Sequence, residues 1–196
     1  MTATADTALL TPAILRTSHA AGLPWPQYLQ AHASRTSSWG QHLANARLSP
    51  AQQALLGGFT RRMPVLVLTG AWCGDCAVQC PMLGTIADAC PAADVRFLEQ
   101  ADHADLAAKL RINAGTRVPT VIWCAEDFEF CSLLGDRTLA RYRALAARQL
   151  GSSCPLPGAA VPADEAAATL AGWVEEFERV QLMLRLSPRL RQAHGD

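Results

Sequence analysis

Short runs of apolar residues alternate with segments of helical periodicity through the middle of the chain. The run from Val65 to Leu68 ends at Gly70, and a continuous apolar run bounded by a turn residue is typical of a buried strand. Residues 94–100 contain Val95, Phe97 and Leu98 and predict a second strand. We therefore expect two buried strands separated by a longer segment.

Two further apolar runs, residues 118–124 and 128–134, predict strands joined by a hairpin turn at Glu126 and Asp127. Residues 113–117 predict a turn-rich loop before them. Helical segments separate the first three strands, so the order predicts a parallel start and an antiparallel finish. The expected fold class is α/β, with a mixed sheet and helices on both faces.

Helix signals place the elements between and after these strands. One helix is expected from Cys76 towards Cys90, bent or interrupted by Pro81, and another from Asp102, its predicted cap. Asp136 is the predicted cap of a helix that reaches about residue 150. Its arginines are expected to form a solvated face, and they are Arg137, Arg141, Arg143 and Arg148.

The two ends of the chain predict helical extensions of a central domain. We expect a helical N-terminal region at 1–62, a central domain at 63–150, and a loop with a C-terminal helix at 151–196. Ser49 and Pro50 are typical of a helix start, here of a helix ending near Arg61.

The C-terminal helix is expected to begin at Asp164 and to carry an apolar stripe. We expect this stripe to pack in the core. Leu182, Met183 and Leu186 broaden it and leave room for a homodimer.

Composition excludes several classes of protein. The 196 residues are half apolar, which suffices for one good core, and 17 basic residues balance 17 acidic ones. No basic field indicates nucleic acid, and neither a secretory signal nor a membrane-spanning run is recognised. The seven cysteines do not resemble a secreted disulfide framework. A cytoplasmic protein with mostly reduced thiols is expected.

The candidate chemistry lies directly after the first strand, in Trp72-Cys73-Gly74-Asp75-Cys76. Two cysteines separated by two residues, the first on a turn and the second in the first turn of a helix, are typical of a redox dithiol. A helix N-terminus favours a thiolate, so Cys73 is the predicted nucleophile. Cys76 is the predicted resolving cysteine, while Trp72 would cover the site and Gly74 would permit a tight turn.

With Pro81 in the following helix and Val118-Pro119-Thr120 opening a later strand, the motif resembles the thioredoxin superfamily. The resemblance implies a thioredoxin-like fold and a cis-proline at Pro119. It also implies that Val118 and Pro119 bind the substrate through backbone groups. More narrowly, the helical N-terminus and Asp75 resemble a bacterial thioredoxin-like group whose functions are poorly defined. The expected activity is thiol-disulfide exchange with protein or small-molecule disulfides and an unidentified electron donor, without a cofactor.

Two positions depart from the usual thioredoxin pattern. That family has a buried aspartate six residues before the first cysteine, where this chain has Val67, and a proline where it has Asp75. The usual proton acceptor for the resolving thiol is therefore missing, and Asp75 is a candidate substitute. A carboxylate beside Cys73 should oppose its ionisation, so we expect a Cys73 pKa no lower than about 7 and a reducing couple.

Alternatives remain at the level of sequence. Cys80 lies on the same helix face as Cys76 and is either a buried small side chain, an extra redox thiol or a metal ligand. No second cysteine or histidine pair completes a zinc site, so no metal is expected. Cys124 and Cys131 are expected to be free thiols on either side of the hairpin turn. A non-catalytic interaction module is the alternative from another class.

Overall fold

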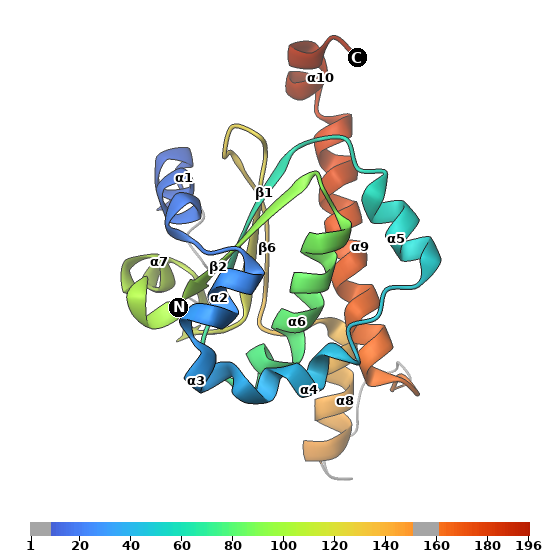
Figure 1. The fold of residues 1–196 in the computed structure, drawn as a ribbon. Helices are drawn as coiled ribbons and strands as arrows, with labels where there is room; N and C mark the ends of the chain where they lie inside the picture. Colours follow the sequence, from blue (N-terminus) through green and yellow to red (C-terminus); the bar gives the residue numbers. More distant parts are fainter. Residues whose placement is uncertain (1–8, 151–160) are drawn as a thin grey trace.

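A four-stranded mixed sheet forms the centre of the computed structural model, which describes residues 9–150 and 161–196 (Figure 1). The strand order is β2-β1-β5-β6, with β1 parallel to β2 and antiparallel to β5. β6 pairs antiparallel with β5. The strands are β1 (Met63–Thr69), β2 (Ala93–Glu99), β5 (Thr120–Cys124) and β6 (Phe130–Gly135). The predicted mixed sheet is confirmed.

Strand β1 is buried along its whole length because helices cover both faces of the sheet. In Figure 1, α6 (Gly74–Ala89) and α9 (Glu165–Leu186) lie on one side of the sheet, and α1 (Pro12–Ala21) and α7 (Ala104–Lys109) lie on the other. Helix α6 contains Pro81, as predicted. The helices on both faces are therefore confirmed.

The apolar stripe of α9 packs in the core, as predicted. Trp123 of β5 lies 6.3 Å from Trp173 and 5.4 Å from Phe177 between ring centroids. Asp164 caps this helix by accepting from the Ala167 N–H. Leu182, Met183 and Leu186 are exposed, and the homodimer stays a prediction. A last helix, α10 (Pro188–His194), follows α9.

Two predicted helix caps are wrong. A short 3-10 turn (Gln100–Asp102) precedes α7, whose cap position is His103 and not Asp102. Helix α8 (Leu139–Gln149) is capped by Thr138, which accepts from the Arg141 N–H. Asp136 lies two residues before that cap position, and its carboxylate accepts hydrogen bonds from Arg137 and Tyr142 instead.

The predicted loop before β5 contains a small hairpin. Strands β3 (Arg111–Ile112) and β4 (Gly115–Thr116) pair antiparallel across a two-residue turn. Both turn residues have left-handed backbone angles, with φ of 48° at Asn113 and 58° at Ala114. Such turns match the twist of paired strands, which explains a hairpin where turn residues alone indicated a loop.

The N-terminal region forms α2 (Trp25–Ala31), α3 (Ala33–Thr36), a 3-10 turn (Ser37–Trp39), α4 (Gly40–Leu43) and α5 (Pro50–Gly57). Ser49 and Gln52 form a reciprocal capping box at α5, which confirms the predicted start. The helix ends at Gly57 and not near Arg61. The loop predicted at 151–162 and Cys154 fall largely or wholly outside the described residues.

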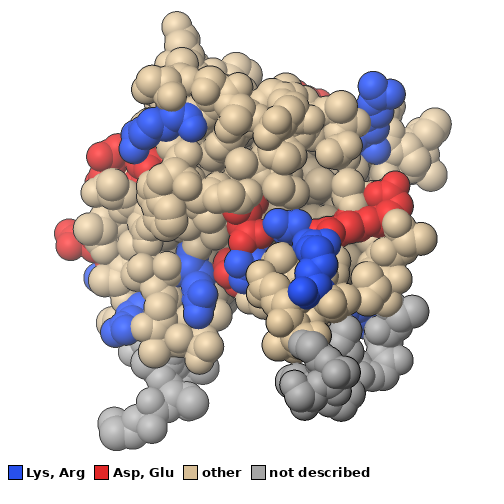
Figure 2. Space-filling view, turned by 90° about the horizontal axis from the view of Figure 1, so that it is seen from below, with Lys and Arg blue, Asp and Glu red and all other residues tan. Residues whose placement is uncertain are grey.

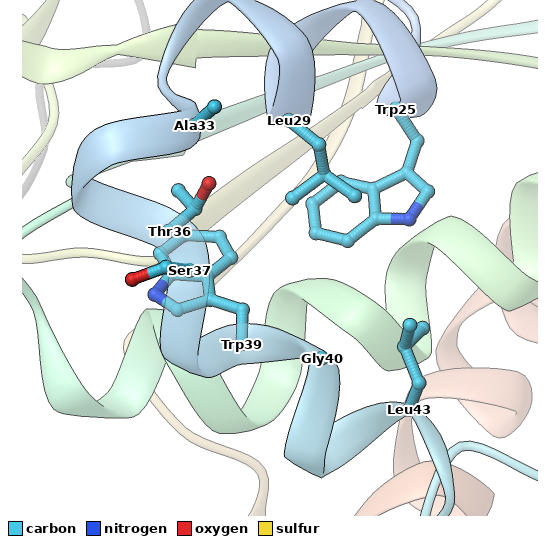
Figure 3. Close-up of a pocket in the computed structure, with 8 residues that line it drawn as sticks. All are labelled: Trp25, Leu29, Ala33, Thr36, Ser37, Trp39, Gly40 and Leu43. Atoms are coloured by element: carbon cyan, nitrogen blue, oxygen red, sulfur yellow. The ribbon is translucent and has the colours of Figure 1, made fainter.

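Aromatic side chains join this region to the sheet. The Trp25 ring lies 4.9 Å from Phe97 of β2, and Tyr28 and Trp39 surround them. Leu23 also pairs with Phe97 through backbone hydrogen bonds. An apolar pocket of about 250 Å³ lies between α2, α3 and α4. Figure 3 shows its lining residues, with Trp25 and Leu29 on one side and Leu43 on the other. Within residues 9–150 and 161–196, no helix has both the length and the apolar character required to cross a membrane.

Candidate active site

Cys73 occupies the N-cap position of α6, directly after the loop that leaves β1. Its thiol is half-buried, and the side chain makes no capping hydrogen bond to the helix backbone. The neighbouring Trp72 is 66% exposed, so its ring stands at the surface beside Cys73. Gly74 has no left-handed backbone, and a Cβ there would meet nothing within 4 Å. The backbone at Gly74 therefore does not require a glycine, although the sequence predicted a tight turn that glycine would permit.

Cys76 lies one turn into α6 and is fully buried. Its sulfur accepts from the Gly70 N–H at 3.5 Å. The Cys73 thiol donates to the Val118 carbonyl at 3.5 Å, and the Val118-Pro119 peptide bond is cis. The structure thus brings together Cys73, Cys76, Val118 and Pro119, which are far apart in the sequence.

Both thiols are held in their protonated form. The pKa of Cys73 is raised by its hydrogen bond with Cys76 and then by burial, which together outweigh the N–H groups of Asp75 and Cys76. Burial is the main cause of the raised pKa of Cys76. This direction agrees with the expectation that Cys73 is not an acidic thiol.

Asp75 forms ion pairs with two arginines that come much later in the sequence, Arg137 and Arg141. Arg137 donates to one carboxylate oxygen and Arg141 to the other, the latter at 3.0 Å. The side chains of Arg137 and Arg141 are only 24% and 15% exposed. The prediction that both belong to a solvated face is wrong, because Asp75 draws them into an ion-pair network.

The network continues away from the dithiol. Arg141 also pairs with Glu165 of α9, and Arg148 donates to the same carboxylate at 2.5 Å. Figure 2 shows the molecule from below, the end at which α8 lies in Figure 1, and acidic and basic side chains alternate across the middle of that face. The ion pairs therefore connect the motif helix to α8 and α9.

Sequence reasoning missed Glu99, the last residue of β2, which is only 3% exposed. It accepts from the Ala71 N–H at 3.0 Å and from the Tyr28 hydroxyl at 2.6 Å, and Arg35 lies 3.5 Å away. The available signal was an acidic residue ending an apolar strand parallel to the strand that leads into the dithiol. Parallel neighbours end at the same edge of a sheet.

The remaining cysteines lie in the core or at its margin. Cys80 is fully buried, and its sulfur lies 3.3 Å from the Thr69 hydroxyl. Burial raises the pKa of Cys124 to about 12 and that of Cys131 to about 11. All six cysteines that the structure describes are free, and no group of three or more metal-binding side chains occurs in the same ranges.

Comparison with known proteins places this geometry in a family. A family model described as Thioredoxin matches residues 22–144. A crystal structure of a protein of unknown function from Pseudomonas aeruginosa is 19% identical, with a TM-score of 0.57, over 81% of this chain and 91% of that one. An HIV epitope-scaffold structure is 17% identical, with a TM-score of 0.57, over 83% and 93%. None of the curated proteins compared with the chain matches it.

Proposed function

The chain belongs to the thioredoxin family, and we propose that it is a cytosolic thiol-disulfide oxidoreductase that reduces disulfides with Cys73 and Cys76. The observation that carries the proposal is the position of the dithiol. Cys73 occupies the N-cap position of α6 and is half-buried, while Cys76 is fully buried one turn further along the helix. The carbonyl oxygen of Val118, the residue before the cis-proline, lies 3.5 Å from the Cys73 sulfur.

In this reaction, the Cys73 thiolate attacks one sulfur of a substrate disulfide, and the other sulfur leaves as a thiol after taking a proton. The product is a mixed disulfide between Cys73 and the substrate. Cys76 then loses its proton and attacks the Cys73 sulfur. This forms the Cys73-Cys76 disulfide and releases the second substrate thiol, so that two electrons pass from protein to substrate.

Reduction is the favoured direction because neither thiol is stabilised as a thiolate. A strongly oxidising dithiol has a low-pKa cysteine whose thiolate stabilises the reduced form. Here the pKa of Cys73 is raised, and so is that of Cys76. An unidentified donor would return the electrons to the protein.

Substrate binding is assigned to the surface around Cys73. The exposed Trp72 ring offers apolar contact, and the backbone of Val118 and Pro119 would hold an extended substrate segment. Asp75 and Gly74 support the site from the first turn of α6. Cys80 is fully buried, which disfavours direct contact with a substrate.

Insulin reduction with dithiothreitol tests the proposal. We expect wild type to accelerate turbidity and Cys73→Ser to lose the acceleration. Cys131→Ser, which removes a free thiol on β6, is the matched control and should behave as wild type. Equal rates for wild type and Cys73→Ser would contradict the proposed oxidoreductase activity and favour the alternative, a non-catalytic interaction module.

A Cys76→Ser variant identifies the substrate class. Without the resolving thiol, the mixed disulfide at Cys73 should accumulate, and mass spectrometry would show whether proteins or small thiols are attached. The double variant Cys73→Ser with Cys76→Ser is the control for attachment at other cysteines.

A further inference from the structure

The loop of residues 70–72, which joins β1 to α6, contacts both cysteines of the dithiol through its backbone. The Gly70 N–H donates to the Cys76 sulfur at 3.5 Å, and the Gly70 carbonyl accepts from the Cys73 N–H at 2.9 Å. Two successive peptide groups of this loop therefore hold the sulfur of one cysteine and the backbone of the other. Because each peptide group is planar, a contact that fixes one side of it also fixes the direction of the other side.

Glu99 fixes one of these peptide groups from the opposite side. The Ala71 N–H belongs to the same peptide group as the Gly70 carbonyl, and it donates to the Glu99 carboxylate at 3.0 Å. Glu99 is buried at the end of β2, beside the end of β1. The carbonyl of this peptide group is thus held by Cys73 and its N–H by Glu99. A rotation of the group would leave buried polar atoms without partners, which is unfavourable.

The N-terminal region in turn holds Glu99. The Tyr28 hydroxyl of α2 is fully buried and donates to Glu99 at 2.6 Å, and Arg35 of α3 lies 3.5 Å from the same carboxylate. In the described ranges, Tyr28 and Arg35 are the charged or titratable side chains that pair with Glu99. Hydrogen bonds therefore lead from α2 through Glu99 to the loop that contacts the dithiol.

The Gly70 N–H matters most in the resolving step. Cys76 is fully buried and attacks Cys73 as a thiolate. A hydrogen bond to a charged acceptor is about twice as strong as one to a neutral acceptor, so the Gly70 N–H supports the thiolate more than the thiol. Val67, where a thioredoxin has its carboxylate, has an apolar side chain that can support neither form. The direction of the Gly70 N–H should therefore affect the rate of resolution.

We propose that Glu99 is a positioning residue of the redox site, which keeps the Gly70 N–H directed at the Cys76 sulfur and so accelerates resolution of the mixed disulfide. The inference deepens the proposed function and rests on it. Tyr28 holds Glu99, so the N-terminal region contributes to the rate of the reaction. A contribution of Glu99 to folding stability alone is the competing explanation.

Glu99 acts through the loop, and the chemistry of the step is unchanged. Cys76 loses its proton to water, and its thiolate forms the bond to the Cys73 sulfur. The bond from Cys73 to the substrate sulfur breaks, and the substrate sulfur takes up a proton from water. One proton is thus released and one taken up, while the electron pair of the broken bond leaves with the substrate sulfur.

Stopped-flow reaction of the reduced protein with excess 5,5′-dithiobis(2-nitrobenzoate) separates the two steps. The first equivalent of nitrothiobenzoate reports attack by Cys73. The second reports resolution by Cys76 and, as a unimolecular step, does not depend on the reagent concentration. The double variant Cys73→Ser with Cys76→Ser gives the release from the other cysteines, which is subtracted. Release of only one equivalent by wild type would contradict the proposed function itself, whatever the Glu99 variants do.

Glu99→Leu removes the acceptor of the Ala71 N–H. Since a misplacement of about 1 Å can cost about 10²-fold in rate, we expect the second phase to slow at least about 10-fold near neutral pH. The first phase should change less than about 2-fold, because the Cys73 thiol contacts the Val118 carbonyl and not this loop.

The pH profile of the second phase is the readout that a purely structural role would not move. Loss of a donor makes the Cys76 thiolate harder to form, so the apparent pKa of the second phase should rise by about one unit in Glu99→Leu. The deficit in rate should therefore shrink as the pH rises. The other titratable thiols beside Cys76 are Cys73, which is bonded to the substrate in this step, and Cys80.

Two milder substitutions keep the test informative if Glu99→Leu does not fold. Glu99→Gln retains an oxygen that can accept from the Ala71 N–H, and its second phase should stay within about 3-fold of wild type. Tyr28→Phe removes the hydroxyl that holds Glu99 and should slow the second phase at least about 3-fold, with an unchanged first phase. A second phase as slow in Glu99→Gln as in Glu99→Leu would contradict positioning through this hydrogen bond.

Gln181→Leu is the matched control. Gln181 of α9 is also buried, and its side-chain oxygen also accepts from backbone N–H groups, those of Thr60 and Arg61 before β1. Its loss should lower the stability measured by urea denaturation and leave the second phase as in wild type. An equal slowing in Gln181→Leu, or wild-type second phases and pH profiles in Tyr28→Phe and folded Glu99→Leu, would overturn the positioning role and leave the proposed function intact.

Discussion

The carboxylate of Asp75 lies between the two cysteines in the sequence, yet its charge is balanced by Arg137, which precedes α8, and by Arg141 of α8. Arg137 and Arg141 each donate to it, and all three side chains are largely buried. A negative charge beside Cys73 opposes its ionisation, and the two guanidinium groups that offset the charge of Asp75 also pair with Asp136 and Glu165. Asp75 therefore limits the positive field that the arginines exert on Cys73.

Asp75→Asn should lower the Cys73 pKa. The substitution removes the negative charge and leaves both guanidinium groups nearby, and a positive charge stabilises a thiolate. We expect a decrease of about one pKa unit. The measurement is the pH dependence of Cys73 alkylation by iodoacetamide, followed by mass spectrometry of the labelled residue. Asp88→Asn, an exposed carboxylate near the other end of α6, is the control, and an unchanged or higher Cys73 pKa in Asp75→Asn would contradict the argument.

The wild-type pH profile is a second prediction at this scale. Since the pKa of Cys73 is raised above its ordinary value of 9.0, its thiolate should be a minor species at neutral pH. Alkylation of Cys73 should therefore still accelerate as the pH passes 9.0. A rate that reaches its plateau below about pH 8 would indicate a thiol more acidic than an ordinary cysteine and would contradict the reducing assignment.

Among the elements, the hairpin of β3 and β4 depends on an unfavourable backbone conformation. Ala114 has a φ of 58°, and a left-handed conformation costs a residue with a Cβ about 1–2 kcal/mol. Asn113 at 48° tolerates this region better, because its side chain forms local hydrogen bonds. The turn is therefore stabilised by the strands on either side of it and not by Ala114.

Ala114→Gly should stabilise the protein by about 0.5–1 kcal/mol, because glycine adopts positive φ without steric cost. Urea denaturation followed by circular dichroism measures the change in unfolding free energy. Ala108→Gly, at an exposed position in α7, is the matched control and should destabilise by about 1 kcal/mol. Destabilisation by both substitutions would show that Ala114 is not strained.

The elements also show which parts of the site the sequence could predict. Apolar runs identified all four strands of the main sheet, and the spacing of Cys73 and Cys76 identified the start of α6, because both signals are local. The pairing of Asp75 with Arg141 joins residues 66 positions apart. No local pattern distinguishes a paired arginine from a solvated one, so the sequence alone predicts a solvated face for Arg137 and Arg141. Glu99 was missed for the same reason, since its partners Tyr28 and Ala71 come from distant segments.

For the whole molecule, the N-terminal helices do more than cover the sheet. They carry Tyr28 and Arg35, which reach Glu99, and Trp25, which packs between α6 and β2. Close contact between α2 and α6 depends on Gly84, where a Cβ would lie 2.5 Å from the Trp25 ring. The absence of a side chain at Gly84 thus determines how closely the N-terminal region approaches the helix that carries the dithiol.

Gly84→Ala should destabilise the protein even though alanine favours a helix more than glycine does. A Cβ at 2.5 Å from a buried indole forces the ring or α2 to move, and overpacking of this kind costs about 1–3 kcal/mol. Gly57→Ala at the end of α5 is the matched control, because a Cβ there meets nothing within 4 Å, and it should be neutral or stabilising by up to about 1 kcal/mol. Urea denaturation followed by tryptophan fluorescence measures both. Equal stability of the two variants would mean that α2 does not pack tightly on α6.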